Sequence, residues 1–233
     1  MHKTVSFDFS VAGVDALLMT FTSNAADDLP LLLTQLRQQI LTNLSDVVVD
    51  VVPAYSTLLV YYDARTVRLY DLQLALEHLV SEIEQTRLPQ AQPLLLEVPV
   101  VYGGEHGPDL ERVAALNKLT PDQVIEKHLA ADYVVAALGF SPGFAYLSGL
   151  DEQLVTPRLD TPRKQVPAGS VGIAGVQTAV YPTAGPGGWN LIGKAQMRWF
   201  NVNGNIQLAH GPDAMTPVQV GDKVRFIRQG DTT

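Results

Sequence analysis

The first ninety or so residues alternate between apolar patterns typical of helices and of strands. Residues 70–86 repeat apolar side chains at helical spacing, and a second helix is expected over about 27–44. Four apolar or β-branched runs predict strands, at residues 16–21, 46–53, 57–63 and 94–100. The two middle runs would form a hairpin. The resulting order, β-α-β-β-α-β, predicts a ferredoxin-like unit within an α+β protein.

The pattern changes near residue 95. Only Gly13 of the 18 glycines lies in the first 95 residues, so turns should crowd the second half. Two helices are expected there, one over about 110–116 and one capped by Thr120 with Pro121 at its first position. Residues 132–138 read as a buried strand.

The remainder of the second half predicts a closed or nearly closed β-barrel, because many short strands are separated by Gly and Pro corners. At its end, VQVGDKVRFIR reads as two strands joined by a turn at Gly221–Asp222. We therefore expect two domains, a ferredoxin-like domain of helices and strands over residues 1–93 and a β-barrel domain over 94–233 that carries the candidate site.

Composition excludes several classes of function. A net charge of −8 and a pI of about 5.0 argue against partners that are nucleic acids or anionic membranes. The absence of cysteine excludes disulfides and thiol catalysis. No apolar run approaches the roughly 20 residues of a membrane span, and no leader is evident, so we expect a cytoplasmic protein. The five histidines show no metal-ligand spacing, and no bound metal is expected.

Basic residues gather in the second half of this acidic chain. Five lie between Gln153 and Phe200, with Asp160 as the only acid among them; they are Arg158, Arg163, Lys164, Lys194 and Arg198. One interpretation is a site for a carboxylate or phosphate, with arginine giving bidentate contacts. The other is a basic surface patch that offsets the acidity of the first domain.

Glycine, serine and histidine supply further candidates. Glycines at 169, 172 and 175 would form a backbone nest for an anion or, equally, turn barrel corners. Ser170 is a nucleophile only if a base such as His128 or His210 stands beside it, and no G-x-S-x-G elbow is present. A turn-forming or substrate-binding serine is the alternative. His128 falls in the last turn of a predicted helix, where a cation is favoured.

Aromatic residues follow tight glycine turns at PGF (142–144) and PGGW (186–189). Such turns hold an aromatic ring rigidly, which suits the wall of a pocket. Core packing at a barrel corner explains the same pattern.

One long block identifies a resemblance. GFSPGFAYLSGLDEQLVTPRLDTPRKQVPAGSVGIAG, followed by QTAVYPTAGPGGWNLIGK, resembles the family of the 5-oxoprolinase B subunit, also called allophanate hydrolase subunit 1 or KipI, of the carboxyltransferase subdomain C and D type. The likeness also covers DALLMTF, VVPAYSTLLVYYD and the terminal GDKVRF. It implies a ferredoxin-like domain followed by a cyclophilin-like β-barrel.

The resemblance also implies an activity. Family members work with a partner, the 5-oxoprolinase C subunit (allophanate hydrolase subunit 2 type), and with a third lactam-hydrolase-type subunit. Together these subunits would use ATP to open 5-oxoproline to glutamate. The ATP, with its Mg²⁺, would bind in this chain or elsewhere in the complex. This chain would be inactive alone. Two alternatives remain: an allophanate hydrolase or urea carboxylase type of subunit, and an inhibitor of a sporulation-type histidine kinase. Carboxyl transfer needs a biotin carrier, and no Met-Lys-Met carrier motif occurs here.

Site residues follow from the matching motifs. His128 would carry a proton, Ser170 is the weaker catalytic candidate, and Arg158 with Arg163 would bind a carboxylate or phosphate. Gln177 would bond an amide, with Gly169 and Lys194 nearby. The pocket wall would comprise Phe140, Pro142, Gly143, Phe144, Tyr146, Pro167, Pro186, Gly187, Gly188 and Trp189. The chain departs from the family pattern at Gly185, Lys194–Ala195 and Ala179, which bears on the substrate more than on the fold.

Overall fold

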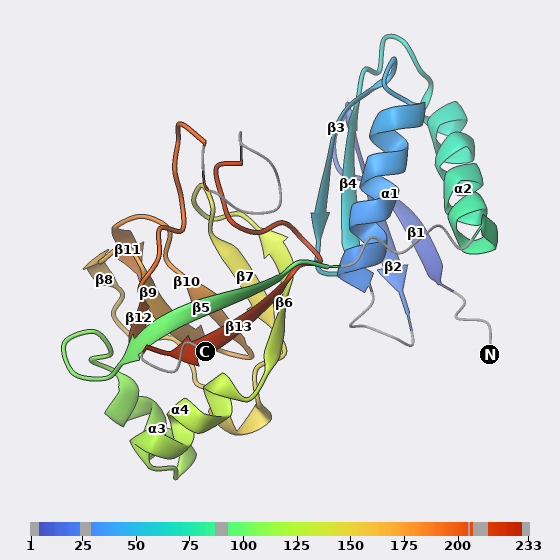
Figure 1. Cartoon of the computed structure of the whole chain (residues 1–233). Coiled ribbons are helices and arrows are strands. Elements are labelled where there is room, and N and C mark those ends of the chain that lie inside the picture. Colours follow the sequence, from blue (N-terminus) through green and yellow to red (C-terminus); the bar gives the residue numbers. More distant parts are fainter. Residues whose placement is uncertain (1–4, 24–28, 87–92, 205, 207–213, 230–233) are drawn as a thin grey trace. The chain divides into compact units, whose positions relative to one another are not determined.

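The computed structural model describes residues 5–23, 29–86, 93–204, 206 and 214–229. Within them the chain divides into two compact units, residues 1–93 and 94–233, which are taken separately (Figure 1). No described helix is both long enough and apolar enough to span a membrane.

The first unit is a four-stranded antiparallel sheet in the order β1-β2-β4-β3, with two helices packed on it (Figure 1). Its elements are β1 (Ser6–Val11), β2 (Ala16–Thr22), α1 (Leu29–Asn43), β3 (Val48–Ala54), β4 (Thr57–Tyr62) and α2 (Leu69–Thr86). Alternate β2 residues such as Leu17 and Met19 share one buried core with Leu33 of α1 and Leu76 of α2. The predicted β3–β4 hairpin is confirmed.

The predicted order of this unit is wrong in one strand. The run expected at 94–100 forms β5 (Leu95–Tyr102), which belongs to the second unit and pairs with strands of the barrel. The sheet edge beside β2 is taken instead by β1, which was not predicted. A hairpin between β1 and β2 closes a loop of only a few residues, so this pairing has a low entropic cost.

The second unit is a closed β-barrel, as the sequence predicted, and the structure forms it from seven strands. Its strands run in the order β6-β13-β5-β12-β9-β10-β7, and β7 returns to β6. Among the described strand pairs, only β13–β5 is parallel. Strands β8 and β11 form a separate two-stranded ribbon. The remaining elements are α3 (Leu110–Asn117), α4 (Pro121–Leu129), β6 (Asp132–Leu138), β7 (Ala145–Ser148), the short 3₁₀ turn Glu152–Leu154, β8 (Arg163–Val166), β9 (Ser170–Ala174), β10 (Gln177–Val180), β11 (Gly185–Gly187), β12 (Asn190–Ala195) and β13 (Lys223–Arg228).

Helices α3 and α4 lie together at one end of the barrel (Figure 1). Val113 of α3 and Val124 of α4 enter the barrel core. The predicted cap of α4 is confirmed, because the Thr120 hydroxyl accepts the Gln123 N–H and the Gln123 side chain accepts the Thr120 N–H.

The strand pair predicted around Gly221–Asp222 does not form. Of the two expected strands only β13 is present in the described residues, and it lies between β5 and β6. The turn bonds to β6 instead: the Gly221 N–H donates to the Val135 carbonyl, and the Val135 N–H donates to the Asp222 carbonyl. Both edges of β13 are therefore filled by strands distant in sequence, which a local alternation pattern does not reveal.

Candidate functional site

The barrel wall separates two clusters of buried side chains. Successive side chains of a strand point to opposite faces of a sheet. On β10, Val180 joins the barrel core, whereas its neighbour Ala179 joins a second cluster on the outer side. On β12, Ile192 and Leu191 divide in the same way. The outer cluster is rich in aromatic residues and forms the base of a pocket.

The pocket has a volume of about 270 Å³. It lies over the outer face of the barrel wall and beside the β8–β11 ribbon. Its lining residues are Phe140, Phe144, Tyr146, Arg158, Pro162, Tyr181, Pro186, Gly187, Gly188 and Trp189. Most of these were predicted as site residues, all except Pro162 and Tyr181, and the structure brings them together from separate segments of the chain.

Phe144 stands at the centre of the aromatic lining. Its ring meets four others edge-on, at centroid distances of 5.3 Å to Phe140, 4.9 Å to Tyr146, 5.4 Å to Tyr181 and 5.6 Å to Trp189. Edge-to-face pairs of this kind add stability beyond the burial of apolar area. The pocket is thus a rigid aromatic site rather than a loose surface hollow.

Arg158 supplies the only formal charge in the lining. Its guanidinium carbon lies 6.0 Å from the centre of the Trp189 ring, within the range of a cation–π contact. Within the described part of the chain no carboxylate pairs with it. Arg158 is therefore a cation held by an aromatic face and open to an anionic ligand.

Tyr181 was not predicted, and neither was Pro162. The Tyr181 side chain is almost wholly buried, and burial raises the pKa of its phenol. A backbone hydrogen bond from Trp189 and the charges of Arg158 and Arg163 act in the opposite direction. The phenol thus keeps its proton at neutral pH. The sequence signal that would have found it is Gly187, which has no side chain where the phenol lies.

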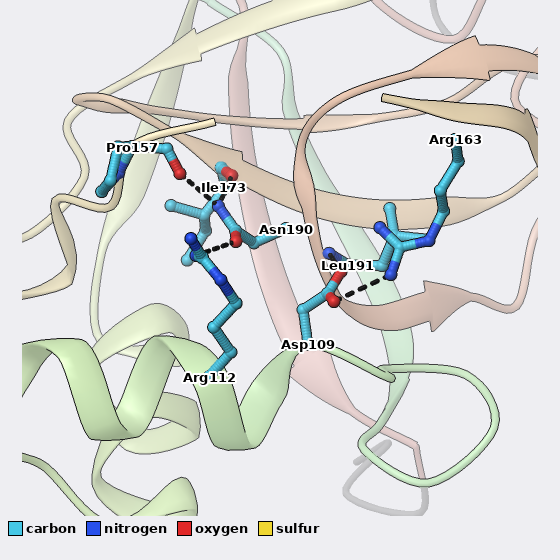
Figure 2. Close-up of polar contacts among 7 residues, drawn as sticks. All are labelled: Asp109, Arg112, Pro157, Arg163, Ile173, Asn190 and Leu191. Atoms are coloured by element: carbon cyan, nitrogen blue, oxygen red, sulfur yellow. Dashed lines mark hydrogen bonds and ion pairs between the residues drawn. The ribbon is translucent and has the colours of Figure 1, made fainter. Parts of the chain in front are cut away.

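Arg163, predicted as a second ligand for an anion, is already paired. Its Nη2 donates to Oδ1 of Asp109 at 2.8 Å, and the other carboxylate oxygen accepts the Leu191 N–H at 2.7 Å (Figure 2). The Asp109 side chain is 9% exposed. This buried ion pair ties the start of α3 to β8 and to β12, so Arg163 has a structural role beside the pocket rather than in it.

A second polar tie lies next to the first. Asn190 is fully buried; its Oδ1 accepts a hydrogen bond from Arg112 at 2.7 Å, and its Nδ2 donates to the carbonyls of Pro157 and Ile173 (Figure 2). Asn190 follows Trp189 directly and Pro157 precedes Arg158. The contact therefore fixes the two backbone positions that carry the cation–π pair.

Phe140 has a strained backbone at the edge of the pocket. It adopts a φ of 74°, in the left-handed region that bulky side chains rarely occupy. The residue is 66% exposed. The hairpin that carries it is anchored at Gly143, whose carbonyl accepts a hydrogen bond from Trp199 Nε1 and whose missing side chain makes room for Phe200. An exposed aromatic held at this cost is typical of a functional position.

Replacing Phe140 tests the strain directly. We expect Phe140→Gly to be more stable than Phe140→Ala by about 1 kcal/mol, because both remove the ring but only glycine relieves the left-handed φ. Urea unfolding of the two variants measures the difference. A more stable alanine variant would contradict the assignment.

Gly187 lets the ribbon approach the phenol. A Cβ atom there would overlap the Tyr181 hydroxyl and ring, whereas one at Gly188 would meet Pro162 at an ordinary 3.5 Å. We expect Gly187→Ala to destabilise the protein by about 1–3 kcal/mol and to displace Tyr181. Gly188→Ala is the matched control, expected to cost much less in thermal unfolding. Equal costs at the two positions would show that the ribbon is not seated on Tyr181.

His128 lies on the other side of the barrel wall from the pocket. It is fully buried, with Nδ1 2.8 Å from the Tyr102 hydroxyl, Nε2 2.9 Å from the Thr178 hydroxyl, and its ring stacked on Phe226. Burial lowers its pKa to about 3. The expectation of a cation at the helix end is therefore wrong, and the structure separates His128 from the aromatic site.

The glycine nest is also not formed. The Gly169 N–H donates to the Tyr181 carbonyl at 2.8 Å and the Gly175 N–H to the Thr156 carbonyl at 2.7 Å, so neither faces an anion. Ser170 is 3% exposed and lies on β9 opposite Lys194 of β12. The other predicted residues outside the pocket lining are Pro142, Gly143, Pro167, Gly169, Gln177 and Lys194. His210 is outside the described residues.

Across the described ranges, no group of three or more His, Asp or Glu side chains is placed to hold a metal ion. The chemistry that the pocket itself offers is binding and polarisation. Aromatic faces would hold a flat ligand, Arg158 would meet a negative group, and a protonated phenol would donate a hydrogen bond.

These features define a class: a two-unit protein whose closed β-barrel carries an aromatic pocket with one arginine on its outer wall. The sequence model of one family, described as carboxyltransferase domain, subdomain C and D, matches residues 7–208. The chain belongs to this family.

Curated relatives carry one name. A protein of Bacillus subtilis (strain 168), named as the B subunit of 5-oxoprolinase, is 40% identical over 188 residues, which cover 77% of this chain and 75% of the relative. A protein of the same name from Escherichia coli O157:H7 is 47% identical over 155 residues, covering 66% and 67% of the two chains.

Solved structures agree on the fold. The structure of TTHA0988 superposes with a TM-score of 0.72 at 32% identity; the match covers 94% of this chain but only 40% of TTHA0988. The Kluyveromyces lactis urea carboxylase superposes with a TM-score of 0.73 at 18% identity and is covered to 22% of its length. The second likeness concerns the fold alone.

Proposed function

We propose that this chain is a subunit of an ATP-dependent lactam hydrolase, and that with other subunits it opens 5-oxoproline to glutamate in the cytoplasm. The observation that supports this most is the 40–47% identity to relatives named as the 5-oxoprolinase B subunit, over about two thirds or more of each chain. The partners proposed are the C subunit of such an enzyme and a third, lactam-hydrolase-type subunit.

The pocket suits a part in that reaction. A lactam carbonyl resists attack by water, and phosphorylation of its oxygen by ATP would make it a better electrophile. Hydrogen-bond donors and cations placed around the carbonyl stabilise the negative charge that develops there. ATP and its Mg²⁺ are proposed to bind elsewhere in the complex, because the lining here is mostly aromatic and has one cation.

Reconstitution tests the proposal. The complete complex, formed by co-expression of this chain with its two partners, is expected to release glutamate from 5-oxoproline only when ATP is present. A complex without this chain is expected to release none. Absence of ATP-dependent release from the intact complex would refute the proposal.

A pocket variant locates the activity. Trp189→Leu removes the ring that Arg158 and Phe144 contact, and we expect it to lower kcat/KM of the complex at least about tenfold. Exposed Val176 on the same barrel offers a matched control, because Val176→Ala removes a 64% exposed apolar side chain that is not part of the lining. Equal losses in the two variants would argue against the pocket as the site.

A further inference from the structure

We propose that the pocket recognises a ring amide acid at two points: Arg158 binds its carboxylate, and the Tyr181 hydroxyl donates a hydrogen bond to its ring carbonyl. The class of substrate in this assignment rests on the proposed function. The assignment adds the two residues that would recognise that substrate. It also separates two arginines that the sequence alone treats as equivalent.

The two arginines differ in what already holds them. Arg163 donates to Asp109, a carboxylate that is 9% exposed and also bonded to the Leu191 N–H. Its charge is therefore largely neutralised before a ligand arrives. Arg158 is exposed, lines the pocket, and contacts an aromatic face rather than an acid. An arginine without a carboxylate partner beside an apolar hollow is the stronger site for a ligand's anionic group.

Tyr181 brings a hydroxyl donor to the pocket. Its phenol lines the pocket, and a phenol hydroxyl can donate its proton to an acceptor on a ligand. A phenol is protonated at neutral pH, and burial raises its pKa further, so the proton stays on the oxygen. The hydroxyl lies beneath Gly187, at the ribbon side of the pocket, where both Arg158 and Arg163 act on it electrostatically. A neutral donor near positive charge suits a carbonyl oxygen that gains negative charge during reaction.

The size and walls of the pocket limit what lies between these two points. A volume of about 270 Å³ is below the range of about 300–1,000 Å³ that holds drug-sized ligands, so the site suits a small ring compound. Flat aromatic faces from Phe140, Phe144 and Trp189 suit the apolar methylene edge of such a ring. The combination of a ring, one carbonyl and one carboxylate describes a cyclic amide acid.

The test uses the full chain alone, without ATP or partners, and follows tryptophan emission. The chain contains two tryptophans, of which Trp189 lines the pocket and Trp199 does not. Three probes are titrated: 5-oxoproline, 2-pyrrolidinone, which lacks the carboxylate, and cyclopentanecarboxylate, which lacks the ring amide. The variants are Arg158→Gln, Tyr181→Phe and the control Lys164→Gln, which removes an exposed cation on β8.

A crossed pattern is expected. Arg158→Gln should weaken the binding of 5-oxoproline and cyclopentanecarboxylate about tenfold and leave the binding of 2-pyrrolidinone unchanged. Tyr181→Phe should weaken the binding of 5-oxoproline and 2-pyrrolidinone about fivefold and leave the binding of cyclopentanecarboxylate unchanged. Lys164→Gln should change none of the three. A variant that is destabilised would bind all three probes less tightly. A loss of binding for selected probes therefore distinguishes a defect in recognition from a defect in folding.

In the binding test, three results would overturn the assignment. They are no emission change with 5-oxoproline, an equal loss of binding in Arg158→Gln and Lys164→Gln, or losses of binding that do not follow the group that the probe lacks. Its failure is distinct from failure of the proposed function. A chain that binds with the crossed pattern within an inactive complex refutes only the function. A complex that hydrolyses 5-oxoproline with unchanged KM and kcat in Arg158→Gln and Tyr181→Phe refutes only this assignment.

Discussion

Acidification from pH 6.5 to pH 3 is expected to cost this protein about 4–5 kcal/mol of folding free energy through His128 alone. The imidazole is neutral, and both of its nitrogens form hydrogen bonds inside the barrel. The Thr178 hydroxyl donates to the Gly172 carbonyl at 3.1 Å and so accepts from Nε2–H, which leaves Nδ1 to accept from the Tyr102 hydroxyl. Protonation of Nδ1 would remove that last bond and bury a charge.

The sign of the effect follows from the two pKa values. In the unfolded chain His128 titrates near its ordinary 6.5, and in the folded protein near 3. Between these values the unfolded state binds a proton that the folded state does not, so stability falls by about 1.4 kcal/mol per pH unit and levels off near pH 3. Asp132 and Asp151, whose pKa values are lowered mainly by hydrogen bonds, add to the loss only at the acidic end.

Urea unfolding at a series of pH values from 7 to 4 measures this slope. His128→Gln is expected to flatten it, and His78→Gln, at a side chain 72% exposed, is the matched control and should leave it as in the wild type. An NMR titration of the wild-type imidazole gives an independent reading. A His128 that titrates near 6.5 in the folded protein would disprove the prediction.

Asp109→Ala is expected to destabilise the protein by roughly 3–5 kcal/mol, since it leaves a partly buried guanidinium without its counter-charge. The loss is expected to be large because Nη1 of Arg163 is buried without a hydrogen-bond partner in the described part of the chain, so Asp109 is what compensates this group. The Leu191 N–H would also lose its acceptor. Denaturant unfolding measures the change.

An exposed ion pair provides the control. Asp71→Ala breaks the contact with Arg68, whose side chain is 86% exposed, and should cost far less than Asp109→Ala because solvent screens this pair. A double variant that also replaces Arg163 by Met should be less unstable than Asp109→Ala alone, because it removes the stranded charge. Similar costs for Asp109→Ala and Asp71→Ala would show that the tie in Figure 2 contributes little.

Local patterns predicted the elements of this protein well. The cap at Thr120, the hairpin of β3 and β4 and the strand over residues 132–138 each depend on neighbouring residues, and each is confirmed. Failures occurred where a pairing joins distant segments. Strand β5 reads as the end of the first unit but pairs with β13, more than a hundred residues later, and the strand pair at Gly221 is replaced by contacts with β6.

The candidate site divides in the same way. Glycine turns followed by aromatic residues located Phe144 and Trp189 in advance, because a tight turn fixes a ring locally. Sequence does not state which face of a strand meets the pocket. A one-residue step along β10 separates Thr178, which faces His128, from Ala179, which faces the aromatic cluster. That step removed His128 from the site. Tyr181 enters the site because Gly187 leaves space for its hydroxyl.

The sequence by itself determined the family, the barrel, most of the aromatic lining and Arg158, because these follow from motifs and short-range turn chemistry. The tertiary structure decided which of two similar arginines is neutralised, since Asp109 lies 54 residues from Arg163 in the chain. It also decided that His128 is a neutral core residue, because the environment that lowers its pKa is the barrel interior. Desolvation and ion pairing depend on neighbours in space, and only the folded chain specifies those neighbours.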